Sequence, residues 1–317
     1  MHLKKFCMAV CLFAVATFSA SAFAQGLNWE GQTGAVITPF AYTASAPASK
    51  FGKPEVAFHF LNAGNVIGND YQFSVTEGIC KRFEVGFTQS FSSAGNSSAT
   101  LLGAVPQTSL FTGGYSAFHG KLTVIPENLM KTKWVPAIAV GAIGRIGDQR
   151  ASFVVTNLEG QPSYSQTNAD FYVVATKTVT QIKGLPIVLN FGEKVTNASI
   201  MGIAGNAGNA GSPLNTLSTD QRWQGRLFGA AAFVVKGPAK SALILGSEAV
   251  QQPKYVQGVG NLATIPTSMT YFVRIVPHME GSPLQVDLAC VQAAGKIAPG
   301  VDLNAKARFG MGMSYHF

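Results

Sequence analysis

Charged residues that alternate with large apolar residues are the first candidates for chemistry in this sequence. They occur in the stretches CKRFEVGFTQSF (80–91), FHGKLTV (118–124) and SMTYFVRIV (268–276). Successive side chains of a strand point to opposite faces of a sheet, so the charged residues and the apolar rows fall on opposite faces. By this parity, one face of the predicted sheet carries Arg82, Glu84, Lys121, Arg226, Arg274, Asp287 and Arg308.

Five of these side chains are basic and two are acidic. If they lined an aqueous lumen, the surplus would attract small anions or acidic glycans. Two other interpretations stay open at this point. Arg–Glu and Arg–Asp pairs could cross-brace a narrow lumen, or another part of the chain could plug it.

Other kinds of chemistry have weaker support in the sequence. His59, His119, His278 and His316 are isolated and lack the spacing of a helical metal site, and no Walker loop or G-x-S-x-G elbow is present. Ser314 and His316 share one face, which keeps an outer-membrane hydrolase as an alternative. No acidic residue is placed to orient the pair. We therefore expect no enzymatic activity, no metal and no cofactor.

The first 24 residues have the pattern of a secretory signal peptide. Lys4 and Lys5 precede an apolar run from Phe6 to Phe18, and an A-x-A site ends at Ala24. Removal of this leader leaves two cysteines, Cys80 and Cys290. An exported chain could join them in a disulfide or keep both as free thiols, and the sequence favours neither.

The composition indicates a membrane protein without a membrane helix. Hydrophobic residues make up 47% of the 317 residues and charged residues only 12%, whereas soluble domains contain about 25% charged residues. The sequence after the leader has no run of about 18 apolar residues, as a spanning helix requires. A lipid-facing β-barrel has such a composition because half of its strand positions contact hydrocarbon.

Most of the remaining sequence has the pattern of strands joined alternately by short turns and by long polar loops. We predict an all-β fold, a transmembrane up-and-down antiparallel β-barrel of about 12 strands (10–14) formed by residues 51–317. Residues 25–50 form an N-terminal segment in the lumen or the periplasm. The predicted strands are 54–63, 69–77, 80–91, 115–125, 133–143, 169–179, 185–195, 222–235, 240–249, 267–277, 283–293 and 306–317. Segment 222–235 is apolar on both faces, which a plugged barrel or a soluble sandwich core would explain.

The sequence closes with ARFGMGMSYHF, another alternating strand. We expect its apolar positions to face lipid and its last aromatic residues to lie at the membrane interface. The apolar positions are Phe309, Met311, Met313, Tyr315 and Phe317. This pattern resembles the C-terminal signal of bacterial outer-membrane proteins, and the resemblance implies recognition by the barrel-assembly machinery.

A further resemblance covers most of the sequence after the leader. GLNWEGQTGAVITPFAYTA (26–44) contains Gly34, Thr38-Pro39 and Ala41-Tyr42, and PAIAVGAIGRIG (136–147) precedes DFYVVATKTV (170–179). These segments resemble poorly characterised bacterial outer-membrane barrels, including the YjbH type associated with exopolysaccharide gene clusters. The resemblance implies a barrel and hints at polysaccharide traffic or an envelope role, and it transfers no catalytic residue.

The sequence therefore predicts a protein of the bacterial outer membrane. We expect a channel or binding site for small or acidic hydrophilic solutes or exported polysaccharide. The expected partners are outer-membrane lipid, lipopolysaccharide and the assembly machinery, with no nucleic acid. The alternative of another class is a secreted, soluble β-sandwich for adhesion or glycan binding.

Overall fold

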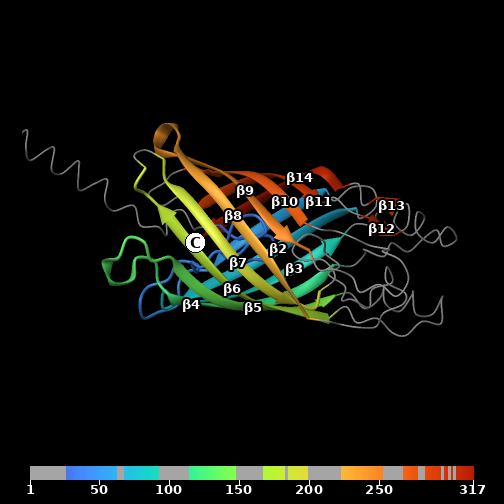
Figure 1. Cartoon of the computed structure of the whole chain (residues 1–317), viewed down its shortest axis with the longest axis horizontal. Helices are drawn as coiled ribbons and strands as arrows, with labels where there is room; N and C mark the ends of the chain where they lie inside the picture. The colour runs from blue at the N-terminus through green and yellow to red at the C-terminus, as the bar shows by residue number, and fades with distance from the viewer. Residues whose placement is uncertain are drawn as a thin grey trace, which may run out of the picture.

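The structure is a computed structural model, drawn in Figure 1. It describes residues 26–62, 68–92, 114–147, 167–182, 185–198, 223–252, 267–277, 283–293, 296–298, 301–302 and 305–317. The predicted signal peptide and His278 lie outside these residues. Within them, no helix is both long enough and apolar enough to cross a membrane.

In the described part of the chain, twelve antiparallel strands close into one barrel, so the predicted fold class is confirmed and the β-sandwich alternative is wrong. Around the barrel the strands follow the order β1-β14-β11-β10-β9-β8-β7-β6-β5-β4-β3-β2. They are β1 (Glu55–Asn62), β2 (Asn69–Ile79), β3 (Phe83–Ser92), β4 (Tyr115–Ile125), β5 (Ala137–Gly147), β6 (Thr167–Val179), β7 (Ile187–Thr196), β8 (Gln224–Lys236), β9 (Ala242–Gln251), β10 (Thr267–Val276), β11 (Leu284–Ala293) and β14 (Ala305–His316). The short strands β12 (Lys296–Ala298) and β13 (Val301–Asp302) pair only with each other. Two 3-10 turns, η2 (Leu129–Lys131) and η3 (Pro238–Lys240), follow β4 and β8.

The two faces of the barrel wall have different side chains. Along β7, for example, Leu189 and Phe191 are exposed on the outside while Asn190 and Lys194 are buried inside. The exposed outer residues are mostly aromatic or aliphatic on every strand from β2 to β10 and on β14. In water such a surface would be unfavourable, whereas in a bilayer it is solvated by acyl chains.

The last strand closes the barrel by pairing with the first. Phe58 of β1 lies opposite Met313 of β14, and Val56 lies opposite Tyr315. Closure leaves no unpaired sheet edge, as a spanning sheet requires. The five apolar residues of the C-terminal row are all exposed on the outer face or at its end, namely Phe309, Met311, Met313, Tyr315 and Phe317.

Strand β3 begins at Phe83, later than the predicted start at Cys80. Cys80 and Lys81 have φ values of 52° and 59°, so they form the tight turn between β2 and β3. The N–H of Arg82 donates to the carbonyl of Ile79 in this turn. Arg82 is therefore exposed at the end of the barrel, and its predicted position on the inner wall is wrong.

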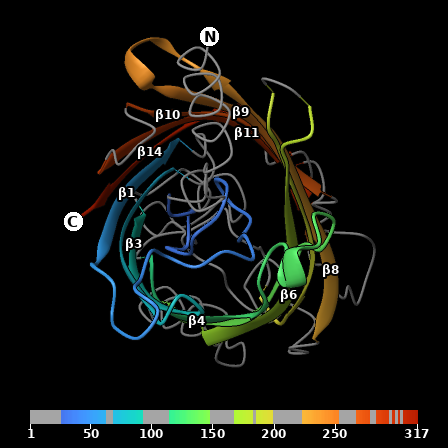
Figure 2. The ribbon, with the colours of Figure 1, turned by 90° about the vertical axis from the view of Figure 1, so that its left-hand side faces the viewer.

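Residues 26–44, which precede β1, lie inside the barrel. Figure 2 shows this segment, in blue, within the ring of strands. We call residues 26–44 the plug. Most of its residues are buried; Leu27, Asn28 and Gln32, for example, are 0% exposed. The chain leaves the lumen beside the β2–β3 turn, where Phe51 pairs with Ile79, and then enters β1.

The plug has a compact fold of its own. The side-chain oxygen of Asn28 accepts the backbone N–H groups of Glu30 and Gln32, and the N–H of Trp29 donates to the carbonyl of Val36. Buried backbone groups need such partners because no bulk water reaches them. The plug therefore enters the lumen as a folded loop whose backbone groups are partly satisfied within it.

Apolar packing holds one side of the plug. Val36, Ile37 and Phe40 belong to one buried cluster with inward-facing apolar residues of β8, β9 and β10, including Phe228 and Phe272. This cluster explains why segment 222–235 is apolar on both faces: one face of β8 meets the outside and the other meets the plug.

Candidate functional site: the plugged lumen

The other side of the plug meets a polar wall. Inward side chains of β1 to β7, β9, β10 and β14 bind it through hydrogen bonds and ion pairs. Thr176 accepts the N–H of Ala41 at 2.7 Å and Asn190 donates to the carbonyl of Pro39 at 3.1 Å. Ser314, near the chain end, accepts the N–H of Leu27 at 3.2 Å. Both ends of the plug are therefore attached to the wall.

Glu30 enters a cluster of charged residues on three neighbouring strands. Arg145 of β5 donates from Nε to Glu30 Oε1 at 2.6 Å and from Nη2 to Asp170 of β6 at 2.6 Å. Lys194 of β7 lies 3.5 Å from Glu30 and 3.2 Å from Asp170. Thr196 donates to the second oxygen of Asp170. Two cations and two carboxylates balance each other here, and one carboxylate belongs to the plug.

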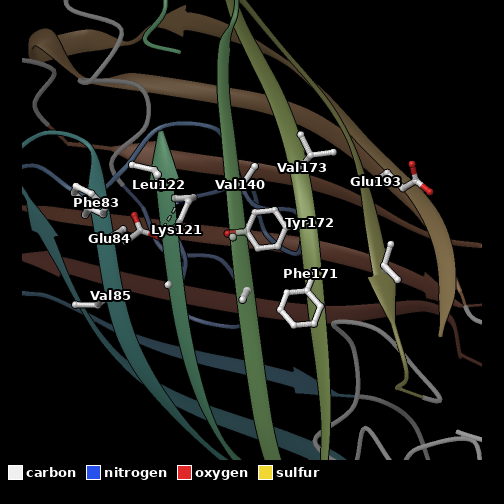
Figure 3. Close-up of a pocket in the computed structure, with 14 residues that line it drawn as sticks. Phe83, Glu84, Val85, Lys121, Leu122, Val140, Phe171, Tyr172, Val173 and Glu193 are labelled. Carbon is white, nitrogen blue, oxygen red and sulfur yellow. Dashed lines mark ion pairs between the residues drawn. The ribbon is translucent and has the colours of Figure 1, made fainter. Parts of the chain in front are cut away.

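Glu84 of β3 forms a second cluster. Its carboxylate accepts the N–H and hydroxyl of Thr33 and the N–H of Ala44. Lys121, directly opposite on β4, lies 2.9 Å from Glu84 Oε1 and also donates to the carbonyl of Thr33. Figure 3 shows the Glu84–Lys121 ion pair, and Tyr172 is drawn nearby on β6. This pair braces neighbouring strands and holds the plug at the same time.

Two further charged residues bind the plug backbone. Glu248 of β9 accepts the N–H groups of Ile37 and Thr38, both at 2.8 Å. Arg274 of β10 donates to the carbonyls of Gly34 and Ala35, and it forms a two-bond pair with Asp287 of β11.

The plug ends at a contact with the turn between β4 and β5. The hydroxyl of Tyr42 donates to Glu127 Oε2 at 2.9 Å, and its oxygen is 2.8 Å from the hydroxyl of Thr178. Burial and the Glu127 carboxylate raise the pKa of the Tyr42 phenol well above its ordinary value. Glu127 also accepts from Lys177 and from the N–H of Thr178.

The remaining charged candidates lie in different places. Glu84, Lys121, Arg274 and Asp287 are buried on the inner wall. Arg226 and Arg308 are half-buried near the end of the barrel that carries the long predicted loops, and Arg226 donates to its neighbours Gly225 and Gln224.

The expected positive surplus is wrong for the described wall. Four more acidic residues are buried on it: Glu55, Asp70, Asp170 and Glu248. Together with Arg145 and Lys194, they make the acidic and basic side chains of the wall equal in number. Any preference for anions must come from a local site and not from the lumen as a whole.

The alternation of side chains along each strand could have identified some of the wall residues that the sequence analysis missed. Arg145 follows Ala139, Gly141 and Ile143 on one face, but the predicted strand ended at 143 and left Arg145 in a loop. Lys194 lies on the same face of β7 as Asn190, and the alternation pattern had already assigned Asn190 to the inner face. By contrast, no pattern in residues 26–44 indicates which wall residue each plug residue meets.

Ser314 and one of the histidines lie in the plugged lumen. Ser314 is buried and is hydrogen-bonded to the plug. His119 is also buried, with its Nε2 atom 3.7 Å from Glu84, beneath the plug. No group of three or more His, Cys, Asp or Glu side chains among the described residues could hold a metal ion.

The two cysteines do not pair. Cys80 lies in the β2–β3 turn, Cys290 lies on β11, and both are free thiols. Three strand spacings separate β2 from β11 around the wall, roughly 14 Å at about 4.8 Å each. A disulfide needs Cα atoms within about 7 Å, so of the two alternatives that the sequence left open, the structure has the free thiols.

A hollow of about 680 Å³ lies in the wall between β3 and β7. Its lining includes the outward-facing side chains of Phe83, Phe171, Val173 and Glu193, several of which are labelled in Figure 3. The small outward residue Gly120 leaves room between the larger ones. Glu84 and Lys121, which hold the plug, also belong to its lining, so the hollow borders the wall residues that bind the plug.

Solved barrels are similar to this chain in fold. A COG4313 outer membrane channel from Pseudomonas putida F1 has 10% identity and a TM-score of 0.45, over 88% of this chain and 98% of its own. The KdgM porin has 8% identity and a TM-score of 0.42, over 84% and 99%. LpxR from Salmonella typhimurium has 11% identity and a TM-score of 0.43, over 83% and 100%. Such likeness concerns the fold and assigns no solute or activity to this chain.

A search of the curated proteins found no match. A family model described as "Protein of unknown function (DUF3034)" matches residues 26–273. The match begins where the plug begins, so the plug and strands β1 to β9 all lie inside it. The narrower resemblance to YjbH-type barrels is not confirmed. The chain belongs to the DUF3034 family.

Proposed function

We propose that this protein is a bacterial outer-membrane barrel that is closed at rest by its plug and passes small hydrophilic solutes when the plug shifts. The exposed apolar outer face supports the membrane location. We assign that face to lipid and lipopolysaccharide, and the C-terminal row to recognition by the assembly machinery.

The polar inner wall is the observation that carries the proposal. Buried ion pairs add little stability compared with apolar packing of the same volume. A barrel that served only as a scaffold could replace Lys121, Arg145 and Lys194 and their partners with apolar residues without losing stability. Charged groups on this wall are useful if water and solutes reach them after the plug moves.

The way the plug is held also supports a reversible closure. Its polar side is bound by hydrogen bonds and ion pairs, which water can replace at low cost once the lumen is hydrated. Small solutes need only a partial shift of the plug. Export of polysaccharide, as the YjbH-type resemblance suggests, would need the whole plug to leave, and we do not include it.

A reversible lock of the plug tests this function. Leu27→Cys and Ser314→Cys place thiols on two residues that are in contact, because the backbone N–H of Leu27 donates to Ser314 Oγ at 3.2 Å. The full-length protein also carries Cys80→Ser and Cys290→Ala. Ionic current is recorded across planar bilayers before and after reduction with dithiothreitol. We expect a silent oxidised form and brief openings after reduction.

The control carries Leu27→Cys alone, which cannot form the lock. Equal current through the oxidised and reduced double variant would overturn the role of the plug as a gate. If neither form carries current, even after Glu248→Ala loosens the plug, the proposal that solutes pass through the barrel is overturned.

A further inference from the structure

The contact between Glu30 and the wall has the chemistry of ligand binding. We propose that Arg145 and Lys194 form a carboxylate-binding site of the barrel, that Glu30 occupies it as an internal ligand, and that an acidic sugar competes with Glu30 and so releases the plug. This inference rests on the proposed function of the plug as a gate, and it names the class of solute.

Charge balance is the first argument. The wall contributes Arg145, Lys194 and Asp170, which together carry one net positive charge. Glu30 neutralises that charge from the plug. When Glu30 leaves, the wall keeps an uncompensated cation in a buried place, which is costly unless another anion enters. The vacated position therefore suits one carboxylate.

The orientation of Arg145 is the second argument. Its guanidinium points one edge at Glu30, while Nη1 and Nη2 are held by Asn168 and Asp170 of the next strand. The wall thus fixes the guanidinium in place without help from the plug. A preorganised guanidinium is the preferred protein group for binding carboxylates, and it loses little entropy when the ligand changes.

The surroundings favour a sugar acid over a simple carboxylate. Tyr172 lies directly opposite Lys194 in the sheet, and its hydroxyl accepts from the plug residue Gln32 at 2.9 Å. Release of the plug frees this phenol as a partner for a sugar hydroxyl. Aromatic rings and neutral hydrogen-bonding groups beside a charged anchor are suited to a polyhydroxylated body that ends in a carboxylate.

Glu30 differs from the other groups that bind the plug to the wall. At Glu248 and Arg274 the wall binds backbone groups and one hydroxyl of the plug, none of which is charged. At Arg145 the wall binds a charged side chain. A free acidic solute can reproduce a carboxylate side chain, but it cannot reproduce a folded loop.

The test measures binding of sodium glucuronate to detergent-solubilised full-length protein. Glucuronate is compared with acetate and with glucose at constant ionic strength. Trp134→Phe and Trp223→Phe leave Trp29 as the single tryptophan. Trp29 is buried beside Glu30 and 5.4 Å from the His59 ring, so plug release shifts its emission to longer wavelength. Calorimetry measures binding in parallel, independent of plug movement.

We expect glucuronate, but not glucose, to bind and to shift the Trp29 emission, with acetate weaker than glucuronate. Glu30→Gln removes the competitor and should lower the half-saturating glucuronate concentration at least fivefold. Lys194→Gln should raise it at least fivefold. Lys53→Gln, on the exposed chain before β1, is the control and should change nothing.

Two outcomes would overturn the inference. The first is unchanged or weaker glucuronate binding in Glu30→Gln, which would make Glu30 a structural brace. The second is equal binding of glucose and glucuronate, or of acetate and glucuronate, which would remove the solute class. Either result leaves the disulfide-lock experiment untouched, because that experiment records current without any added solute.

Discussion

Glu248 of β9 holds Thr38 of the plug twice, at the backbone N–H (2.8 Å) and at the hydroxyl (2.9 Å). Its other oxygen accepts the N–H of Ile37. One wall carboxylate thus accepts three hydrogen bonds from a single turn of the plug. All of these groups are buried, so each donor depends on this carboxylate for its partner.

Glu248→Ala should therefore loosen the plug. Three buried donors lose their acceptor, which costs roughly 2–4 kcal/mol of stability. Thermal unfolding, followed by the gel shift between unheated and heated samples, measures the loss. Thr38→Val removes only one donor and serves as the matched control, with a cost of about 1 kcal/mol. A loss for Glu248→Ala no larger than that of Thr38→Val would contradict the shared-acceptor interpretation.

Two glycines of β5 give a matched pair of substitutions. A Cβ at Gly141 would lie 2.2 Å from the Tyr172 ring, whereas a Cβ at Gly144 would meet nothing within 4 Å. Gly141→Ala must displace Tyr172 and with it the bond from Gln32. We expect a loss of about 1–3 kcal/mol for Gly141→Ala and almost none for Gly144→Ala. Equal melting temperatures of the two variants would show that Tyr172 moves freely.

Alkaline pH should weaken the end of the plug. Burial raises the pKa of Tyr42 in the folded protein, so its contribution to stability is complete below the ordinary tyrosine pKa of about 10. Above that pH the unfolded chain loses the phenolic proton first, and stability falls by up to about 1.4 kcal/mol per pH unit. The neighbouring charges are Glu127 and Lys177.

Comparison with Tyr42→Phe isolates this effect from the other tyrosines. Melting temperatures of both proteins are measured between pH 8 and pH 11. The wild type should lose more stability than the variant above pH 10, and the two curves should run parallel below it. Parallel curves over the whole range would show that Tyr42 is not anchored by Glu127 in solution.

The fold could be predicted from the sequence because most strands alternate between apolar and polar residues, with β8 as the main exception. All twelve predicted barrel strands overlap an observed one, since alternation along a strand is enforced by the contrast between lipid outside and polar groups inside. Strand ends were less predictable. The φ values of Cys80 and Lys81 place Arg82 in a turn, and the late end of β5 brings Arg145 into the wall.

The candidate site was predictable only in part, for a related reason. Glu84 with Lys121, and Arg274 with Asp287, face each other across neighbouring strands, so parity alone brings each pair to one face. The plug residues that contact the wall do not recur at a regular spacing in the sequence. Thr38 and Glu248 are joined by the shape of the folded loop, which depends on Asn28 and on the packing of Phe40 against β8 and β10.

The outer face can be tested with two substitutions on one strand. Phe191 and Glu193 of β7 both point outward, and Glu193 lies between Val173 and Leu227 of the neighbouring strands. In a bilayer, Phe191→Arg should cost roughly 2–4 kcal/mol, and Glu193→Leu should stabilise the barrel by on the order of 1 kcal/mol. Guanidinium unfolding from lipid vesicles measures both changes.

If this face met water instead, Phe191→Arg would be nearly neutral and Glu193→Leu would promote aggregation, because it would add apolar surface to an exposed apolar face. Opposite signs for the two variants in vesicles therefore require acyl chains around β7.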